Sequence, residues 1–344
     1  MSDQPPVTSA ILLVGGFGTR LAPLTFQTPK PMLSVAGVPF TEHQIVKARA
    51  AGIKEIVLAT SYLADVFEPY FGNGERFGIR ISYAVEESAL GTGGAIANAA
   101  KALHGEGPVV IFNGDVLSSH DLKSQITLHT AEGADVTLHL TQVPDARAFG
   151  VVELNGNRVL TFNEKMENPP TNIINAGCYI FNRAVIEAIP TDRVVSVERE
   201  TFPTLLAGGS TLLGYLDSSY WLDIGTPAAL LKANADLISG AARSTAYDEL
   251  LAKGEFDLCF DSLISRSAEL SPTAIVEKGS LICSGASIGS GARISASFIA
   301  PGASIGANSA LSESFVAPDT EIPSGFIASG QFFGFSEKKY SART

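Results

Sequence analysis

Over the first 135 residues, short apolar runs rich in valine and isoleucine alternate with longer stretches in which apolar and polar positions recur at helical spacing. The apolar runs predict strands at 11–14, 55–59, 81–85 and 109–112. The amphipathic stretches predict helices at 42–51, 92–103 and 121–132. Because strands that alternate with helices build a sheet with helices on both faces, we predict an α/β fold with a Rossmann-like, mixed and mostly parallel sheet. Ligands of such sheets bind beyond the carboxyl ends of the strands.

The next part of the chain is richer in strand patterns. The predicted strands there are 136–142, 150–154, 159–164 and 176–181. A predicted helix at 227–239 closes this region. We therefore assign residues 1–240 to one α/β domain and residues 241–264 to a connector.

The C-terminal part of the chain is periodic. From Val276 to Ile322, nine aliphatic residues follow one another at steps of six, with two steps of five. A small residue stands two places before each of them, and a turn-forming residue stands three places after it. This hexapeptide repeat is the pattern of a parallel β-helix, in which each hexapeptide supplies one short strand and one corner. We predict a left-handed parallel β-helix at 265–335, followed by a tail at 336–344.

Composition and charge exclude several classes of protein. The 344 residues, 45% of them hydrophobic, suit two domains or one large domain with an appendage. A formal net charge of −11 argues against a general nucleic-acid binder and against a basic membrane-surface protein. The three cysteines lack zinc-ligand spacing, and the N-terminus lacks the pattern of a signal peptide. Because no apolar run approaches the ~20 residues that span a bilayer, we expect a cytoplasmic protein.

A glycine-rich loop follows the first predicted strand. Its segment VGGFGTR, at 14–20, is followed by Lys30 between two prolines. Glycine lets a ligand approach the main chain closely, and the N–H groups of such a loop form an anion site. The Arg20 guanidinium can bind phosphate oxygens as a fork, and Lys30 can add a point charge. The spacing fits neither the G-x-x-x-x-G-K-[ST] loop nor the dinucleotide fingerprint. The loop predicts a polyphosphate site, and the alternative is a glycine-rich turn without a ligand.

Several charged and polar residues stand at the ends of other predicted strands. Asp115 occurs in FNGD, and Asp223 occurs in YWLDIGTP more than a hundred residues later. Two carboxylates at a ligand-binding edge suit Mg²⁺, which prefers oxygen ligands and also binds substrate phosphates. Lys165 could hold a phosphate, and Glu164 and Asn175 could hydrogen-bond hydroxyl groups. Taken singly, each has a simpler interpretation as a helix cap, a turn residue or a solvated charge.

Seven motifs occur in a fixed order: GGFGTRLAPLTFQTPKPML, ESALGTGGAI, FNGDV, FGVV, FNEK, NAGCYIF and YWLDIGTP. Together they resemble the sugar-1-phosphate nucleotidyltransferases, also called NDP-sugar pyrophosphorylases, over nearly all of 9–240. The resemblance is closest to the mannose-1-phosphate guanylyltransferases, and the hexapeptide tail is similar to that of many members. It implies that a nucleoside triphosphate and a sugar 1-phosphate give an NDP-sugar and pyrophosphate, with GTP and mannose 1-phosphate as the expected pair.

The resemblance also assigns roles to residues of each motif. It implies catalytic roles for Arg20, Lys30, Asp115, Lys165 and Asp223. It implies that Mg²⁺ is held by Asp115 and Asp223. It implies nucleotide binding by Val14, Gly15, Gly16, Gly18, Thr19, Glu86, Gly91 and Thr92, and sugar-phosphate binding by Gly150, Glu164, Lys165 and Asn175. Ala89 and Met166 stand where many relatives have proline, and Met166 leaves Lys165 less rigidly placed.

Glu86 suggests which base is used. It aligns with a glutamine that contacts the base in thymidylyl-transferring relatives. Guanine presents two adjacent donors, and a carboxylate is an acceptor that can take both, whereas thymine and uracil suit an amide. Glu86 therefore favours guanine, and the alternative is an exposed loop charge. Mannose, which differs from glucose at one hydroxyl, rests on the resemblance and on the guanine argument.

Other functions remain open at this point. One is a glucose-1-phosphate thymidylyl- or uridylyltransferase. A second is a bifunctional enzyme with an acyltransferase β-helix, although such domains use a histidine base and none follows His139. A third is a non-catalytic subunit that senses sugar nucleotides, although all the phosphate and metal residues are present. We expect a homo-oligomer formed through the β-helix, binding neither nucleic acid nor membrane.

Overall fold

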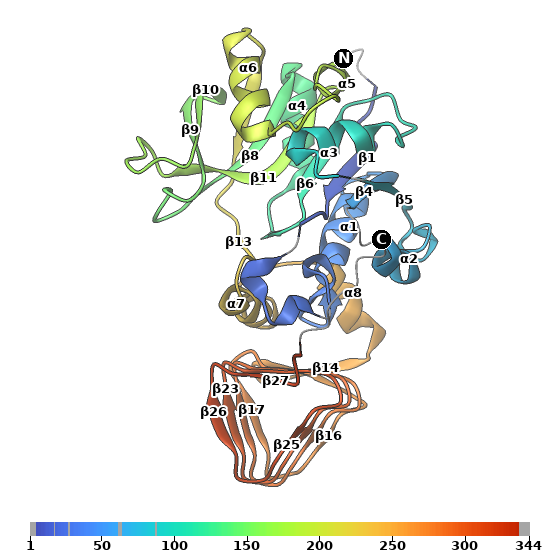
Figure 1. Ribbon diagram of the computed structural model, residues 1–344, viewed down its shortest axis with the longest axis vertical. Coiled ribbons are helices and arrows are strands. Elements are labelled where there is room, and N and C mark those ends of the chain that lie inside the picture. The colour runs from blue at the N-terminus through green and yellow to red at the C-terminus, as the bar shows by residue number, and fades with distance from the viewer. Residues whose placement is uncertain (1–4, 17, 27, 61–63, 87, 337–344) are drawn as a thin grey trace. The chain divides into compact units, whose positions relative to one another are not determined.

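Figure 1 shows the computed structural model of the chain, which describes residues 5–16, 18–26, 28–60, 64–86 and 88–336. Two compact units can be distinguished. The first contains Met1–Gly16, Gln44–Val116 and His120–Trp221, and the second contains Phe17–His43, Leu117–Ser119 and Leu222–Thr344. Because each unit combines segments from distant parts of the sequence, the boundaries at 240 and 264 stay a prediction. Most of the expected tail lies outside the described residues.

The first unit is built on a sheet in which the described residues form nine strands, in the order β5-β4-β1-β6-β11-β8-β12-β10-β9. The strands are β1 (Ser9–Leu13), β4 (Glu55–Thr60), β5 (Arg80–Val85), β6 (Val109–Asn113), β8 (Val136–Gln142), β9 (Gly150–Asn155), β10 (Arg158–Glu164), β11 (Ile173–Phe181) and β12 (Leu212–Leu216). β5, β4, β1 and β6 pair in parallel, as do β8 and β12. β10 and β11 run antiparallel to every strand that they pair with. Seven of these nine strands thus share one direction, which confirms the mixed, mostly parallel sheet.

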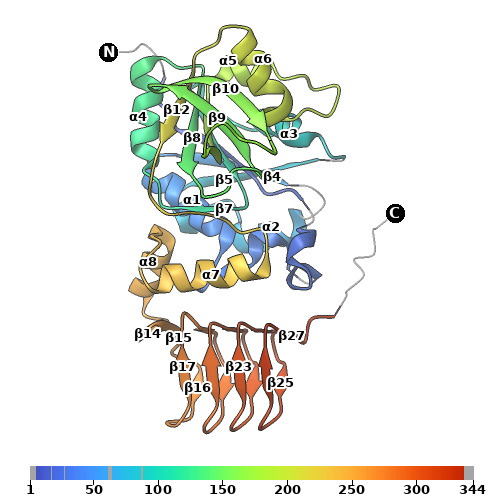
Figure 2. The ribbon, with the colours of Figure 1, turned by 90° about the vertical axis from the view of Figure 1, so that its left-hand side faces the viewer.

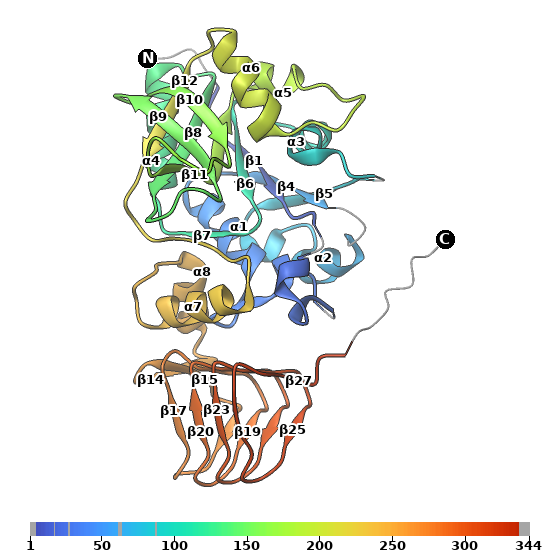
Figure 3. The same cartoon turned by 60° about the vertical axis from the view of Figure 1, so that its left-hand side comes forward.

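Helices cover both faces of this sheet. They are α1 (Phe40–Ala50), α2 (Ala64–Phe71), η4 (Glu75–Phe77), α3 (Gly91–Ala100), α4 (Leu122–Glu132), α5 (Arg183–Glu187), the π-helix η5 (Val197–Thr201) and α6 (Phe202–Ala207). Alternate residues of β8 face opposite helices, as strand geometry requires. Val136 and Leu138 join the core that contains Ile96 of α3, whereas the Thr137 hydroxyl lies 2.9 Å from Nδ1 of His129 in α4. Figure 3 shows α3 and α4 on opposite sides of the strands.

The second unit begins with short elements from the N-terminal part of the chain. These are η1 (Thr19–Leu21), η2 (Leu24–Phe26), η3 (Lys30–Met32) and the hairpin of β2 (Ser34–Val35) and β3 (Val38–Pro39), followed much later by α7 (Pro227–Ile238) and α8 (Thr245–Lys253). β7 (Val116–Ser118) and β13 (Trp221–Asp223) form a further two-stranded sheet. The Asn234 side chain of α7 accepts the Ala36 N–H at 2.6 Å, so it holds the hairpin turn. α7 begins at a cap, where the Thr226 hydroxyl accepts the Ala229 N–H at 3.2 Å.

The hexapeptide repeat forms three parallel sheets, which are the sides of a triangular coil (Figure 1). The first sheet contains β15 (Ser262–Ser265), β18 (Leu281–Ile282), β21 (Phe298–Ile299), β24 (Phe315–Val316) and β27 (Phe332–Phe333). The strand β14 (Phe256–Cys259) extends it at the edge next to β15 and runs antiparallel to that strand. The second contains β16 (Glu269–Leu270), β19 (Ser287–Ile288), β22 (Ser304–Ile305) and β25 (Glu321–Ile322). The third contains β17 (Ile275–Glu277), β20 (Arg293–Ser295), β23 (Ala310–Ser312) and β26 (Ile327–Ser329).

The length of each coil follows from the steps of the repeat. Leu281 pairs with Leu263, which is 18 residues earlier, because this coil contains only steps of six. Phe298 pairs with Leu281, which is 17 residues earlier, because this coil contains a step of five. The repeated aliphatic residues fill the interior, with Ile282, Ile299 and Val316 at 0% exposure. Stacked coils lie below α7 (Figure 2), and a Cβ at Gly279 would lie 2.3 Å from Cβ of Ala235 in that helix.

Some elements were not predicted. α2, α5, α6 and β12 fall in stretches without a clear period, and α5 has only five residues. α8 lies in the region interpreted as a connector, where Ala246, Tyr247 and Leu250 form its buried face. No helix among the described residues is long and apolar enough to cross a membrane.

The buried His43 predicts a dependence of stability on pH. Its Nε2 lies 2.9 Å from the Val35 carbonyl and its Nδ1 lies 2.6 Å from the Ser244 hydroxyl. Nε2 must donate to the carbonyl, and because burial keeps the ring neutral, Nδ1 then accepts from the hydroxyl. Burial lowers the pKa of His43 to about 4, against a small opposing effect of the Val35 carbonyl.

Below pH ~6.5 the unfolded chain takes up a proton at His43 that the folded chain does not, so stability falls as pH drops towards 4. We expect the loss at pH 4.5 to be about 2–3 kcal/mol from this residue. Urea unfolding at pH 7.5 and 4.5 measures it, with His43→Gln as the reference chain. The other buried histidines contribute equally in both chains. An equal pH dependence in the two chains would contradict the prediction.

Candidate active site

The loops that follow β1 and β6 lie against each other in the first unit. The two strands pair along their length, and the Gly114 N–H donates to the Leu13 carbonyl at 2.9 Å. A Cβ at Gly114 would lie 2.2 Å from that carbonyl oxygen, so only glycine fits there. This contact places the half-buried Asp115 beside the start of the glycine loop, as expected from the topology.

The first residues of the glycine loop are open to solvent. Gly15 and Gly16 are exposed, and a Cβ on Gly16 would meet nothing within 4 Å, although its φ of +112° requires glycine. Val14 is different, because its side chain is buried and its N–H donates to the Ala59 carbonyl at 3.0 Å. A ligand could therefore reach only the main chain of Val14.

The rest of the loop lies in the second unit, where it meets two other predicted segments. Gly18, with a φ of +60°, precedes the short helix that carries Thr19 and Arg20. A Cβ on Gly18 would lie 3.0 Å from Cβ of Lys30, so the two segments are in contact. The exposed Arg20 guanidinium lies 3.0 Å from the position that a Cβ of Gly225 would take. Arg20 therefore packs on the DIG segment that contains Asp223.

Glu86 lies at the end of β5, and it is half-buried rather than fully exposed. Its carboxylate accepts the Leu90 N–H at 3.2 Å, just before α3 begins at Gly91. Burial raises the pKa of Glu86, and the hydrogen bond from Leu90 opposes the rise. The oxygen of Glu86 that accepts this hydrogen bond is Oε2.

Thr92 uses its hydroxyl inside the protein. The hydroxyl accepts the Val197 N–H at 2.9 Å and donates to Oε2 of Glu198 at 2.8 Å. Thr92 therefore joins the first turn of α3 to the π-helix η5. The Thr92 hydroxyl proton is thus given to Glu198, so a nucleotide could donate to this hydroxyl but not accept from it.

The residues expected to bind the sugar come together on β9 and β10. Gly150 pairs with Glu164, and a Cβ at Gly150 would lie 2.6 Å from the Phe162 ring and 3.1 Å from Glu164 Oε2. Lys165 has a φ of +55°, and its N–H donates to the Phe149 carbonyl at 3.0 Å. This bond fixes the Lys165 main chain without the proline that relatives carry at the next position. The Lys165 side chain is 59% exposed, with Nζ 3.8 Å from Glu164 Oε1.

Asn175 belongs to an irregular part of β11, where Gly177 takes a φ of +75°. The Asn175 amide donates to the Tyr179 hydroxyl at 2.7 Å and accepts the Gly177 N–H at 3.1 Å. Asn113, in the motif that carries Asp115, donates to the same hydroxyl at 3.4 Å. Tyr179 therefore links the NAGCY motif to the FNGD motif.

The sequence profile of one protein family, described as nucleotidyl transferase, matches residues 9–240. The chain belongs to this family. Mannose-1-phosphate guanylyltransferase of Mycobacterium tuberculosis is 48% identical over 84% of this chain and 79% of the relative. Mannose-1-phosphate guanylyltransferase 1 of Arabidopsis thaliana is 35% identical over 83% of this chain and 79% of the relative. Crystalline HddC from Yersinia pseudotuberculosis, complexed with GMP-PN, matches 66% of this chain and 98% of its own at 28% identity and a TM-score of 0.56. These findings confirm the resemblance that the seven motifs indicated.

Sequence reasoning missed one charged residue of this nucleotidyl transferase. Glu198, in η5, accepts from Thr92 and from the Ser196 hydroxyl at 3.0 Å. Burial raises the pKa of Glu164, and the charge of Glu198 is the second cause. Because η5 follows no strand and shows no period, only the acidic segment SVERE after an apolar run gave a signal.

The donor set for a metal is limited. Among the described residues, no group of three or more His, Cys, Asp or Glu side chains is arranged to hold a metal ion. A divalent ion in a nucleotidyl transferase would thus depend on one or two carboxylates together with phosphate oxygens, which is the usual arrangement for Mg²⁺.

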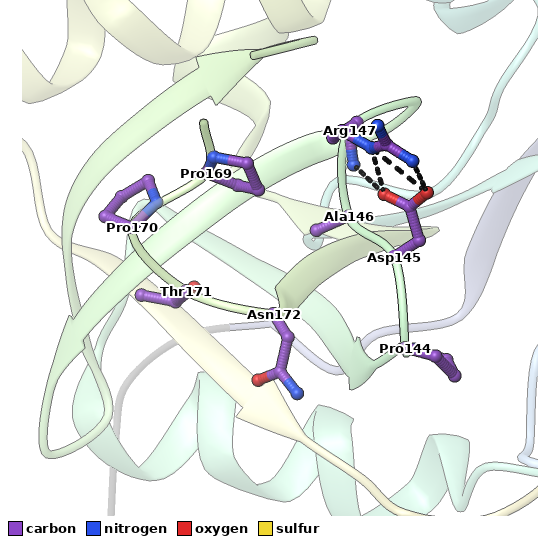
Figure 4. A pocket seen from close by; sticks show the side chains of 8 residues that line it. All are labelled: Pro144, Asp145, Ala146, Arg147, Pro169, Pro170, Thr171 and Asn172. Carbon is purple, nitrogen blue, oxygen red and sulfur yellow. Dashed lines mark hydrogen bonds and ion pairs between the residues drawn. The ribbon is translucent and has the colours of Figure 1, made fainter. Parts of the chain in front are cut away.

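Two surface hollows lie away from these residues. One, of about 700 Å³, is lined by 144–147 and 169–172, with the ion pair of Asp145 and Arg147 on its rim (Figure 4). The other, of about 760 Å³, is lined by 141–144 and 216–221. Neither is lined by a residue expected to bind nucleotide, sugar or metal.

The packing of Arg20 on Gly225 makes a testable prediction. Gly225→Ala needs no unusual backbone angle, but its Cβ would lie 3.0 Å from the guanidinium, so Arg20 must move. Since the exposed guanidinium must shift by only a few tenths of an ångström, part of a charge-assisted bond to phosphate worth about 1.5–3 kcal/mol is lost, and we expect triphosphate affinity to fall about two- to threefold with an unchanged melting temperature. Calorimetry with GTP, UTP and dTTP measures it. Unchanged affinity in Gly225→Ala, beside a clear loss in Arg20→Ala, would contradict this account.

Proposed function

We propose that the protein transfers the guanylyl group of GTP to mannose 1-phosphate, giving GDP-mannose and pyrophosphate. The observation that carries the proposal is its 48% identity, over 84% of the chain, to a relative named mannose-1-phosphate guanylyltransferase. The half-buried Glu86 carboxylate, at the start of α3, supports guanine as the base because it can accept from two adjacent donors. The solved relative complexed with GMP-PN is consistent with this choice.

The proposed reaction needs no nucleophile from the protein. An oxygen of the sugar phosphate attacks the α-phosphorus of GTP, and the bond to the β-phosphate oxygen breaks, so that pyrophosphate leaves with the electron pair. Catalysis then consists of positioning and of charge stabilisation. The open N–H groups at Gly15 and Gly16 would cradle the phosphates, and Arg20 and Lys30 would neutralise their charge.

Asp115 and Asp223 would hold Mg²⁺ in this proposal. Both are half-buried carboxylates that follow the FNG and YWL segments, and carboxylate oxygens are the donors that this ion prefers. When bound, the ion supplies charge neutralisation at the nucleotide phosphates.

The sugar phosphate would bind at the ends of β9 and β10. Lys165 is exposed and held at its main chain, so its ammonium group can meet the phosphate of mannose 1-phosphate. Glu164 and Asn175 would hydrogen-bond the sugar hydroxyls, and glycine at 150 lets the Phe162 ring and the Glu164 carboxylate pack against the main chain there.

The hexapeptide coil would be left-handed and would join copies of the chain. The hexapeptide period is that of a parallel β-helix, and the left hand rests on the likeness of this tail to that of many relatives. Exposed apolar side chains on the last coil support self-association, with Phe326 at 37% and Ile327 at 78% exposure. Analytical ultracentrifugation of the whole chain tests the association.

A substrate matrix tests the proposed function. Pyrophosphate release is measured with Mg²⁺ for GTP, dTTP, UTP, ATP and CTP, each with mannose 1-phosphate and with glucose 1-phosphate. We expect strong release only with GTP and mannose 1-phosphate. In Glu86→Gln, use of GTP should fall about tenfold or more relative to UTP and dTTP, because the amide replaces one acceptor by a donor. Equal losses for all nucleotides would contradict the role of Glu86. If a folded protein released no pyrophosphate with any of these substrate pairs, the proposal that it is a nucleotidyltransferase would be contradicted.

Removal of single charged groups tests the proposed mechanism. Lys30→Ala and Asp115→Asn should each lower turnover on the order of 10²–10³, as for other preorganised charge stabilisers. Asp115→Asn should also raise the Mg²⁺ concentration needed for half-maximal rate, whereas Lys30→Ala should not. A variant that keeps turnover within threefold of the unchanged chain excludes that residue from the reacting centre.

A further inference from the structure

Glu198 occupies a central position among residues with separate assigned roles. It is half-buried in the π-helix η5, a helix type that occurs mostly as single turns and often at functional sites. Its Oε2 accepts from both Thr92 and Ser196. Its charge also acts on Glu164 and on the fully buried Tyr179, where it reinforces the rise in pKa that burial causes.

The residues just before Glu198 are bonded to the start of α3. The Val195 N–H donates to the Leu90 carbonyl at 2.9 Å, and the Gly93 N–H donates to the Val195 carbonyl at 2.8 Å. A Cβ at Gly91 would lie 2.4 Å from that same carbonyl oxygen, so the contact leaves no room for a side chain. The segment 195–198 and the first turn of α3 therefore form one bonded unit.

This unit reaches Glu86 through Leu90. The Leu90 carbonyl binds Val195, and the Leu90 N–H binds the Glu86 carboxylate. Glu86 is the residue expected to recognise the base. On its other side, Glu198 acts on Glu164, which is expected to bind the sugar. Glu198 is thus bonded to the segment that carries the base-binding residue, and its charge reaches the residue expected to bind the sugar.

We propose that Glu198 is a positioning residue, which holds Thr92 and with it the base-binding segment (Glu86 and residues 88–94) in the arrangement that binds nucleotide. This inference rests on the proposed function, since it concerns the same site. It adds a claim that the proposed function does not contain. The hydrogen bond between Thr92 and Glu198, and not the overall fold, sets nucleotide affinity.

Glu200 offers a matched control in the same helix. Its carboxylate accepts the Ser196 N–H at 3.2 Å and pairs with Arg193, so it caps η5 without contact to Thr92. Removal of Glu200 should therefore weaken the helix, whereas removal of Glu198 should weaken the bond to α3.

A double-mutant cycle tests the proposal. Thr92→Val removes the hydroxyl at constant shape, and Glu198→Met removes both charge and acceptor. Each change breaks the bond between Thr92 and Glu198, and each also removes a second partner, that of the Val197 N–H in Thr92→Val and that of the Ser196 hydroxyl in Glu198→Met. We expect each change to raise the Kd of GTP about tenfold, and the pair together to raise it clearly less than a hundredfold, because the shared bond is lost only once. Glu198→Gln should stay within threefold of the unchanged chain, since its amide oxygen still accepts from Thr92. Glu200→Met should lower the melting temperature, and its effect on GTP affinity should add to that of Thr92→Val.

The outcomes separate the inference from the proposed function. Calorimetry measures binding without turnover. If the chain binds GTP but releases no pyrophosphate, the proposed function is contradicted, and the double-mutant cycle can still be measured. If another nucleotide binds instead, the cycle is measured with that nucleotide. Additive effects of Thr92→Val and Glu198→Met would overturn the inference, as would unchanged affinity in either single variant.

Discussion

The burial of both faces of the central sheet is the constraint on which the site depends. All positions of β4 are buried, and β1 and β6 are buried up to their last residue. A polar group in the middle of such a strand loses its hydration and needs a partner inside the protein, as Thr137 of β8 has in His129. Polar side chains that must stay open to a ligand therefore gather mainly where strands end. At the ends of β1 and β6, the contact of Gly114 with Leu13 brings two such loops together. The location of the site is thus a consequence of the core.

An acidic protein can bind anionic substrates when a few cationic side chains lie close to them. The chain carries a formal net charge of −11, whereas nucleotides and sugar phosphates are anions. At physiological salt, charges further apart than about 8 Å are largely screened from one another. In the proposed function, the charges of Arg20, Lys30 and Lys165 would each act on the phosphate beside them, and the acidic remainder of the surface would act mainly on solubility.

Patterns that repeat along the chain could be predicted, and contacts that depend on distant segments could not. The strands of the first unit's sheet other than β12 follow from apolar runs, and the 17- and 18-residue coils follow from the steps of five and six. Thr92 shows the limit. Its motif indicated nucleotide binding, but its hydroxyl is bonded to Val197 and Glu198, more than a hundred residues away. Nothing near Thr92 in the sequence specifies that partner. α8 was missed for another reason, since one buried face on nine residues gives a weak period.

The segment SVERE shows how the structure separates residues that look equivalent in sequence. An ordinary capping box places its glutamate three residues after the serine. Here the Ser196 hydroxyl accepts the Arg199 N–H, and the glutamate that returns to the Ser196 N–H is Glu200, four residues on. The wider turn of a π-helix accounts for the extra residue. Glu200 binds the Ser196 N–H at the helix end, whereas the Glu198 carboxylate accepts from the Ser196 hydroxyl and also from Thr92. The wider turn of the π-helix therefore decides which glutamate binds where. Glu200 caps the helix, and Glu198 binds the start of α3.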